Sequence, residues 1–255
     1  MLGAVRNSLL ALTLVASVAG AQTAAVPPSP PPANPVDAAS IQALQAMGAH
    51  LQSLQRFSVS TEVTGERVLA DGQKLQHSAR AVVDVARPNR LRARMTGPRT
   101  ERELFYDGKT VTLNTPAQKY YSSVEFSGSV AELVSRLQER YGIEVPPSDL
   151  FLWGTAAAPI DRIQSAMYVG QATIGGERTD QYAFRQGNFD WQLWMTTGDR
   201  PLPRKLVIVS RADEARPQSV SLITWNLKPA FKDATFRFTP PKGSSRIELV
   251  PLKTQ

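Results

Sequence analysis

The stretch that decides the fold runs from Phe57 to Val85 and reads FSVSTEVTGERVLADGQKLQHSARAVVDV. Apolar residues alternate with polar ones from Phe57 to Val63, and apolar residues alternate again on the way to Val85. A period of two is typical of strands that bury one face. Between the two halves, Asp71-Gly72 is a dipeptide that favours a tight hairpin turn. The stretch therefore predicts a long antiparallel β-hairpin.

Short strand-like segments separated by turn residues continue this pattern along the chain. We expect strands at 91–95, 103–106, 110–114, 119–124, 167–174, 178–185, 190–196, 204–210, 219–227 and 235–239. Strands that follow one another over short turns usually pair antiparallel. A helix capped by Asp37 precedes them, and a second at 130–141 begins with a Ser129–Glu132 capping box. A short helix is expected at 149–153. The fold class is mainly β (α+β), a curved antiparallel sheet with an N-terminal helix and a helical insertion.

The N-terminal residues predict export. Arg6 is followed by an apolar stretch at 8–20 that is too short to span a bilayer. The stretch ends in Ala19-Gly20-Ala21, a small-x-small cleavage signal. We therefore expect a signal peptide at 1–21, a Pro/Ala-rich disordered linker at 22–36 and a single domain at 37–255, located in the periplasm.

Composition restricts the chemistry and the partners. The chain has no cysteine, which excludes disulfides, thiolate metal sites and a lipid-anchored N-terminal cysteine. Lys and Arg number 29 against 22 Asp and Glu, giving a formal net charge of +7. This excess indicates either a merely basic surface or affinity for anionic lipid or an acidic partner, whereas nucleic acid is not expected for an exported protein. No later segment is apolar for long enough to be a transmembrane helix.

The known catalytic patterns are missing from the sequence. Two histidines are too few for a histidine-rich metal site, and no nucleophile-elbow, phosphate-loop or calcium-loop motif occurs. Carboxylates such as Asp107, Asp149 and Asp190 sit at predicted turns, helix starts and strand entries, where a structural role explains them. We expect no enzyme activity, no cofactor and no metal.

Large aromatic residues mark the expected sheet. Trp191 shares a strand face with Phe189 and Leu193, and Trp225 shares one with Ile223. A curved sheet that carries such side chains under helices either packs a solid core or lines a cavity. Both alternatives stay open at this stage.

Three segments resemble the lipoprotein localisation carriers of the LolA/LolB type. They are VARPNRLR at 85–92, YDGKT at 106–110 and FRFTPPKG at 236–243. Two further segments, YVG at 168–170 and DRPLPRKL at 199–206, look more like an uncharacterised periplasmic family with a domain of unknown function. The resemblance covers most of the expected domain.

What this resemblance implies is a half-open β-barrel with a helical lid over an apolar cavity. In such carriers the cavity holds lipoprotein acyl chains without covalent chemistry, and the arginine that matches Arg87 holds the lid closed; alternatively, Arg87 merely ends a strand. The implied ligand-binding residues are Arg87, Phe105, Phe151, Trp153, Trp191 and Trp225. We expect a periplasmic, non-enzymatic binder of lipid or lipoprotein acyl chains. The alternative is an envelope interaction or stress-sensor module that binds a protein partner and no lipid.

Overall fold

The predicted hairpin is confirmed. In the computed structural model, β1 (Arg56–Val68) and β2 (Lys74–Ala86) pair antiparallel along their whole length, with Phe57 opposite Val85. Gly72 in the connecting turn has a φ of 84°, a left-handed conformation that glycine adopts without steric cost. The hairpin therefore forms where alternation and turn chemistry place it.

The structure describes residues 35–98, 100–143, 152–155 and 158–252. The expected signal peptide and nearly all of the expected linker lie outside these ranges, as does most of the expected helix at 149–153. The remaining elements are α1 (Ala38–Ser53), β3 (Arg90–Gly97), β4 (Thr100–Tyr106), β5 (Thr110–Thr115), η1 (Pro116–Gln118), β6 (Tyr120–Glu125), α2 (Val130–Tyr141), η2 (Ile160–Arg162), β7 (Ile163–Ile174), β8 (Glu177–Gln186), β9 (Phe189–Thr196), β10 (Pro203–Ser210), β11 (Gln218–Asn226), η3 (Asp233–Phe236) and β12 (Ser245–Arg246).

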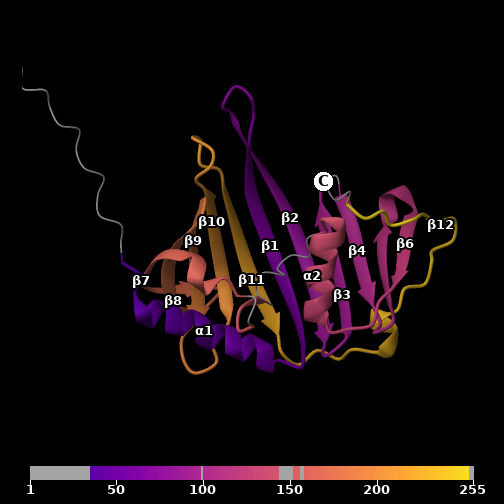
Figure 1. The fold of residues 1–255 in the computed structure, drawn as a ribbon, viewed down its shortest axis with the longest axis horizontal. Coiled ribbons are helices and arrows are strands. Elements are labelled where there is room, and N and C mark those ends of the chain that lie inside the picture. The colour runs from indigo at the N-terminus through magenta and orange to yellow at the C-terminus, as the bar shows by residue number, and fades with distance from the viewer. Residues whose placement is uncertain (1–34, 99, 144–151, 156–157, 253–255) are drawn as a thin grey trace, which may run out of the picture. The chain divides into compact units, whose positions relative to one another are not determined.

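Within the described ranges, twelve strands form one curved, open sheet (Figure 1). Their order is β12-β6-β5-β4-β3-β2-β1-β11-β10-β9-β8-β7, and neighbours are antiparallel except for the parallel pair β12–β6. The chain runs outward from β1 to β6, crosses over, and returns from β7 to β11, which pairs with β1. The first and last long strands thus join the two halves of the sheet.

Both helices cover the same face of the sheet, which we call the inner face and which carries Val59 and Val83 (Figure 1). Helix α1 begins at Asp37, whose carboxylate accepts hydrogen bonds from the first-turn amides, and it buries Leu44 and Leu51. Helix α2 begins with the predicted capping box and buries a stripe that includes Leu133. The apolar core therefore lies between the two helices and the inner face.

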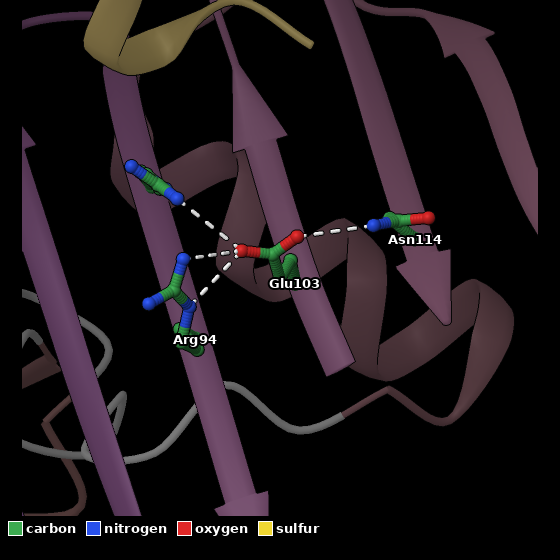
Figure 2. Close-up of polar contacts among 4 residues, drawn as sticks. Arg94, Glu103 and Asn114 are labelled. Atoms are coloured by element: carbon green, nitrogen blue, oxygen red, sulfur yellow. Dashed lines mark hydrogen bonds and ion pairs between the residues drawn. The ribbon is translucent and has the colours of Figure 1, made fainter. Parts of the chain in front are cut away.

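The opposite, outer face carries an ion cluster on three neighbouring strands (Figure 2). Glu103 on β4 accepts hydrogen bonds from Arg94 at 2.8 and 3.0 Å, from Arg92 at 3.2 Å and from the Asn114 amide at 3.0 Å. Its side chain is only 12% exposed. Burial alone raises the pKa of Glu103, but the hydrogen bonds from Arg94, Asn114 and Arg92 outweigh burial and lower that pKa. The carboxylate thus stays ionised and ties β3, β4 and β5 together.

The expected strand at 235–239 is wrong. Residues 233–236 instead form the 3-10 helix η3, and the last strand of the described chain is the two-residue β12 at Ser245–Arg246. The physical reason is side-chain packing: Phe236 is buried, and the Phe238 ring lies 5.4 Å from Phe105 on the outer face. The segment is held by its aromatic rings rather than by pairing with an edge strand.

Candidate ligand-binding hollow

A hollow of about 790 Å³ lies on the inner face of β8–β10 and is bordered by residues of the described stretches 152–155 and 158–164. The residues that line it are Leu152, Trp153, Pro159, Asp161, Arg162, Ile163, Gln164, Gln186, Gly187, Asn188, Phe189, Trp191, Leu193, Leu206 and Ile208. The wall is mainly apolar. Small-molecule sites commonly combine such a wall with a few polar groups.

Aromatic rings form one side of the hollow. The Trp191 ring stacks on Phe184 with centroids 4.1 Å apart and an interplanar angle of 19°. Trp153 approaches Trp191 from the helix side at 5.7 Å. Trp191 and Trp153 are mostly buried, so the rings form a fixed apolar wall.

Strand pairing extends this wall onto β10. In the β9–β10 register, Leu206 lies opposite Leu193 and Ile208 lies opposite Trp191. Because side chains two residues apart point to the same face of a strand, all four project toward the inner face. Leu206 and Ile208 are only partly buried, and their free surface faces the hollow.

A close contact between two glycines places Trp153. A Cβ on Gly48 of α1 would lie 2.7 Å from the Trp153 carbonyl carbon and 2.8 Å from the Gly154 Cα. Only glycine therefore lets α1 and the 152–155 turn approach this closely. The Gln52 amide also donates to the Trp153 carbonyl oxygen at 3.1 Å. Helix α1 thus fixes the turn that carries Trp153.

The rim of the hollow is polar and near neutral. Asp161 and Arg162 in η2 contribute one charge of each sign, and Gln186 and Asn188 contribute amide groups. Gln186 also donates a hydrogen bond to the Pro159 carbonyl oxygen at 3.3 Å. The arrangement offers an apolar interior and a hydrogen-bonding entrance, as an amphipathic ligand requires.

The structure brings together only some of the expected ligand-binding residues. Trp153 and Trp191 meet in the hollow. Trp225 lies beside Phe57 and donates from its indole to the Pro203 carbonyl oxygen at 2.9 Å, and it is not among the lining residues. Phe105 lies on the outer face, away from the hollow. Phe151 falls outside the described residues.

Arg87 contacts the end of α1. Its Nε donates to the Leu54 carbonyl oxygen at 3.0 Å, and its backbone amide donates to the Gln55 carbonyl oxygen at 2.8 Å. Burial lowers the pKa of Arg87 from its ordinary value. A guanidinium here neutralises carbonyl groups at the negative end of the helix dipole. The expected contact of Arg87 with a lid stays a prediction.

Sequence reasoning missed the β10 and η2 side of the hollow. Leu206 and Ile208 are two residues apart in a predicted strand, so the sequence indicates that their side chains share one face of it. It does not indicate that they lie next to Trp191, which depends on the pairing of β9 with β10. No sequence pattern links Leu152 to Ile163, which is the first residue of β7. Their place in the lining depends on the tertiary arrangement alone.

The described part of the chain offers no metal centre, since no three His, Asp or Glu side chains there are grouped to hold an ion. Nor does any helix in the described ranges have the length and apolar character needed to cross a membrane. The hollow and its rim are the main candidate site in the part of the chain that the structure describes.

Several solved structures have a similar fold. An uncharacterised conserved protein from Thermus thermophilus is 11% identical, with 81% of this chain and 99% of that chain covered and a TM-score of 0.47. LprF from Mycobacterium bovis is 15% identical, with 83% and 100% covered and a TM-score of 0.45. Lipoprotein LppX from Mycobacterium tuberculosis is 11% identical, with 76% and 98% covered and a TM-score of 0.44.

No curated protein matches the chain. A family model does match, and it covers residues 40–250, which include all twelve strands of the described sheet, all of α2 and α1 from its third residue onward. The family is described as "Predicted periplasmic protein (DUF2092)". The chain belongs to this DUF2092 family of predicted periplasmic proteins.

Proposed function

We propose that this protein is a non-enzymatic periplasmic binding protein that holds an acyl chain of a lipid or lipoprotein in the hollow. The observation that carries the proposal is the hollow itself, about 790 Å³ in volume, with Trp153, Trp191, Leu193, Leu206 and Ile208 in its wall. Its volume lies within the roughly 300–1,000 Å³ that is usual for small-molecule sites.

The wall chemistry favours an acyl chain over a polar ligand. The aromatic and aliphatic side chains offer no charge to the interior, while each methylene that leaves water contributes about 0.8 kcal/mol. A flexible chain loses conformational freedom on binding, so only part of this gain appears as affinity. Polar groups at the rim, including Asn188 and Gln186, are placed to bond an ester or head group.

Brominated fatty acid provides a direct test, because bromine quenches tryptophan only at short range. The chain has four tryptophans, two in the hollow and two outside it: Trp194 lies on the outer face under Lys205, and Trp225 lies beside Phe57. We expect saturable quenching in the unmodified protein. We expect it to be lost in the double variant Trp153→Phe/Trp191→Phe and kept in the matched double variant Trp194→Phe/Trp225→Phe.

A second pair of variants tests the volume of the hollow. Ile208→Arg places a charged side chain into the wall and is expected to abolish binding, whereas Leu222→Arg changes an exposed outer-face residue and is expected to leave binding intact. Circular dichroism checks that both variants fold. Absence of quenching in the unmodified protein, together with a ligand-free mass in native mass spectrometry, would refute the proposal. Crosslinking for an envelope protein partner would then test the sensor alternative.

A further inference from the structure

A second, smaller pocket lies where the start of β1, the β2–β3 turn and the segment before η3 meet. Its volume is about 270 Å³, and it shares no lining residue with the hollow. Charged and amide side chains dominate it: Arg56, Arg87, Asn89, Arg90, Lys232 and Asp233. The pocket is too polar for an acyl chain, so a different ligand class must be considered.

Positive charge is in excess in this pocket. Four cationic side chains face a single carboxylate, that of Asp233. Arg90 Nη1 lies 3.6 Å from Asp233 Oδ1, but the Asp233 side chain is 80% exposed. An ion pair with so exposed a partner is screened by water and contributes little. The arginines therefore remain largely uncompensated.

Two guanidinium nitrogens in the pocket are buried without a hydrogen-bond acceptor among the described residues, namely Arg87 Nη2 and Arg90 Nη1. Arg87 is held in place by its Nε bond to the Leu54 carbonyl oxygen, and Arg56 is held by its bond to the Phe231 carbonyl oxygen at 3.3 Å. Buried donors without acceptors are costly, so each such group needs an explanation, and a bound anion is one that fits two guanidinium nitrogens.

We propose that this pocket binds an oxyanion of the phosphate class. Guanidinium groups present several N–H donors in a plane, and phosphate oxygens accept them with charge-assisted hydrogen bonds. Arg87 and Arg90 bring two guanidinium groups to the pocket, and Arg56 and Lys232 add positive charge at its wall. The phosphate group belongs either to a lipid head group or to a free phosphate compound, and the chemistry of recognition is the same.

Isothermal titration calorimetry with inorganic phosphate at low ionic strength tests the site. We expect 1:1 binding to the unmodified protein. Arg90→Gln is expected to weaken it about tenfold, the effect of removing one charge-assisted hydrogen bond. The matched control is Arg102→Gln, which removes an equal charge from an exposed residue of β4 outside the pocket. Lys232→Gln, compared with exposed Lys242→Gln, repeats the test without altering a guanidinium.

Competition then distinguishes the sources of the phosphate group. Dihexanoyl phosphatidylglycerol below its micelle concentration is expected to displace inorganic phosphate if a lipid head group is the ligand, and glycerol 3-phosphate alone is expected to do so if a free phosphate compound is. Absence of phosphate binding to the unmodified protein would overturn the proposal. Equal weakening by Arg90→Gln and Arg102→Gln would also overturn it, because the attraction would then be general rather than local.

Discussion

Whether Gly48→Ala raises or lowers the stability of the protein depends on the contact between α1 and the turn that carries Trp153. In an ordinary helix, alanine is more favourable than glycine by about 1 kcal/mol. In this helix the added methyl group would lie 2.7 Å from the Trp153 carbonyl carbon and 2.8 Å from the Gly154 Cα. Both are backbone atoms, so no side chain can rotate away to relieve the clash.

The expected net effect is a loss of stability. Forcing a methyl group into a packed contact costs about 1–3 kcal/mol. Separation of the turn from α1 also breaks the hydrogen bond from Gln52 to the Trp153 carbonyl oxygen, worth about 1 kcal/mol. The gain in helix propensity from alanine roughly cancels the loss of this hydrogen bond, so we expect the free energy of unfolding to fall by about 1–3 kcal/mol.

Urea denaturation followed by circular dichroism measures this difference. Gly97→Ala is the matched control, because a Cβ at Gly97 would meet its nearest neighbours at 3.7 Å or more, an ordinary contact distance. Its stability is expected to change little. If Gly48→Ala also displaces Trp153, quenching by brominated fatty acid should weaken in this variant and stay unchanged in the control.

The result that would refute this reasoning is a Gly48→Ala protein that is more stable than the unmodified one by about 1 kcal/mol, as helix propensity alone dictates. Such a gain would mean that the 152–155 turn does not pack against α1 in solution. The aromatic wall of the hollow would then lack its fixed position.

Two further predictions concern charged residues. Glu103→Gln should lower the free energy of unfolding by about 1–3 kcal/mol at neutral pH, because it replaces the negative charge that Arg92 and Arg94 share with a neutral amide and leaves one acceptor oxygen instead of two. Since the pKa of Glu103 is lowered in the folded protein, its stabilisation is full above the unfolded pKa of about 4.3 and disappears as pH falls through the lower folded value. Arg87→Gln should lower the free energy of unfolding by about 1–3 kcal/mol, because it removes the bond to the Leu54 carbonyl oxygen and a cation from the C-terminal end of α1.

Urea titrations at several pH values check the first prediction, and a difference between Glu103→Gln and the unmodified protein that persists unchanged at pH 3 would contradict it. Arg102→Gln serves as the control for Arg87→Gln, since Arg102 is exposed on β4. Equal stability losses in these two variants would show that Arg87 acts through net charge and not through its contact with α1.

Local pattern was sufficient for most of the sheet. The alternation from Phe57 to Val63 and the Asp71-Gly72 turn are properties of neighbouring residues, and the hairpin they predict has the expected pairing. It failed at 235–239, where Phe236 and Phe238 alternate as in a strand but are held by other rings. Alternation with a period of two indicates that two side chains point to the same side of an extended chain. It does not indicate which residues those side chains contact, or whether the chain pairs with another strand.

The position of Phe105 shows a second limit. It lies between Leu104 and Tyr106, and all three are apolar and buried. Strand geometry allows only alternate residues to face the helices, and the register with β3 and β5 directs Leu104 and Tyr106 inward and Phe105 outward. A run of three apolar residues does not show which of them face the helices. For this reason the sequence could not predict that Phe105, expected to line the cavity, lies on the outer face.

The arginines of β3 and of the turn that precedes it show why a binding site is harder to predict from sequence than a fold. Arg92 and Arg94 point their guanidinium groups at Glu103, which gives them acceptors and explains them as structural residues. Arg87 and Arg90 have the same side chain a few positions earlier, yet each keeps a buried nitrogen without an acceptor among the described residues. The difference lies in the residues that the fold places next to them. Arg92 and Arg94 meet the buried carboxylate of Glu103 on the adjacent strand. Arg87 and Arg90 lie near segment 231–233, which is distant in sequence and carries only the exposed carboxylate of Asp233. What distinguishes the proposed phosphate pocket from the Glu103 cluster is therefore its carboxylate, which is exposed and is outnumbered by cationic residues.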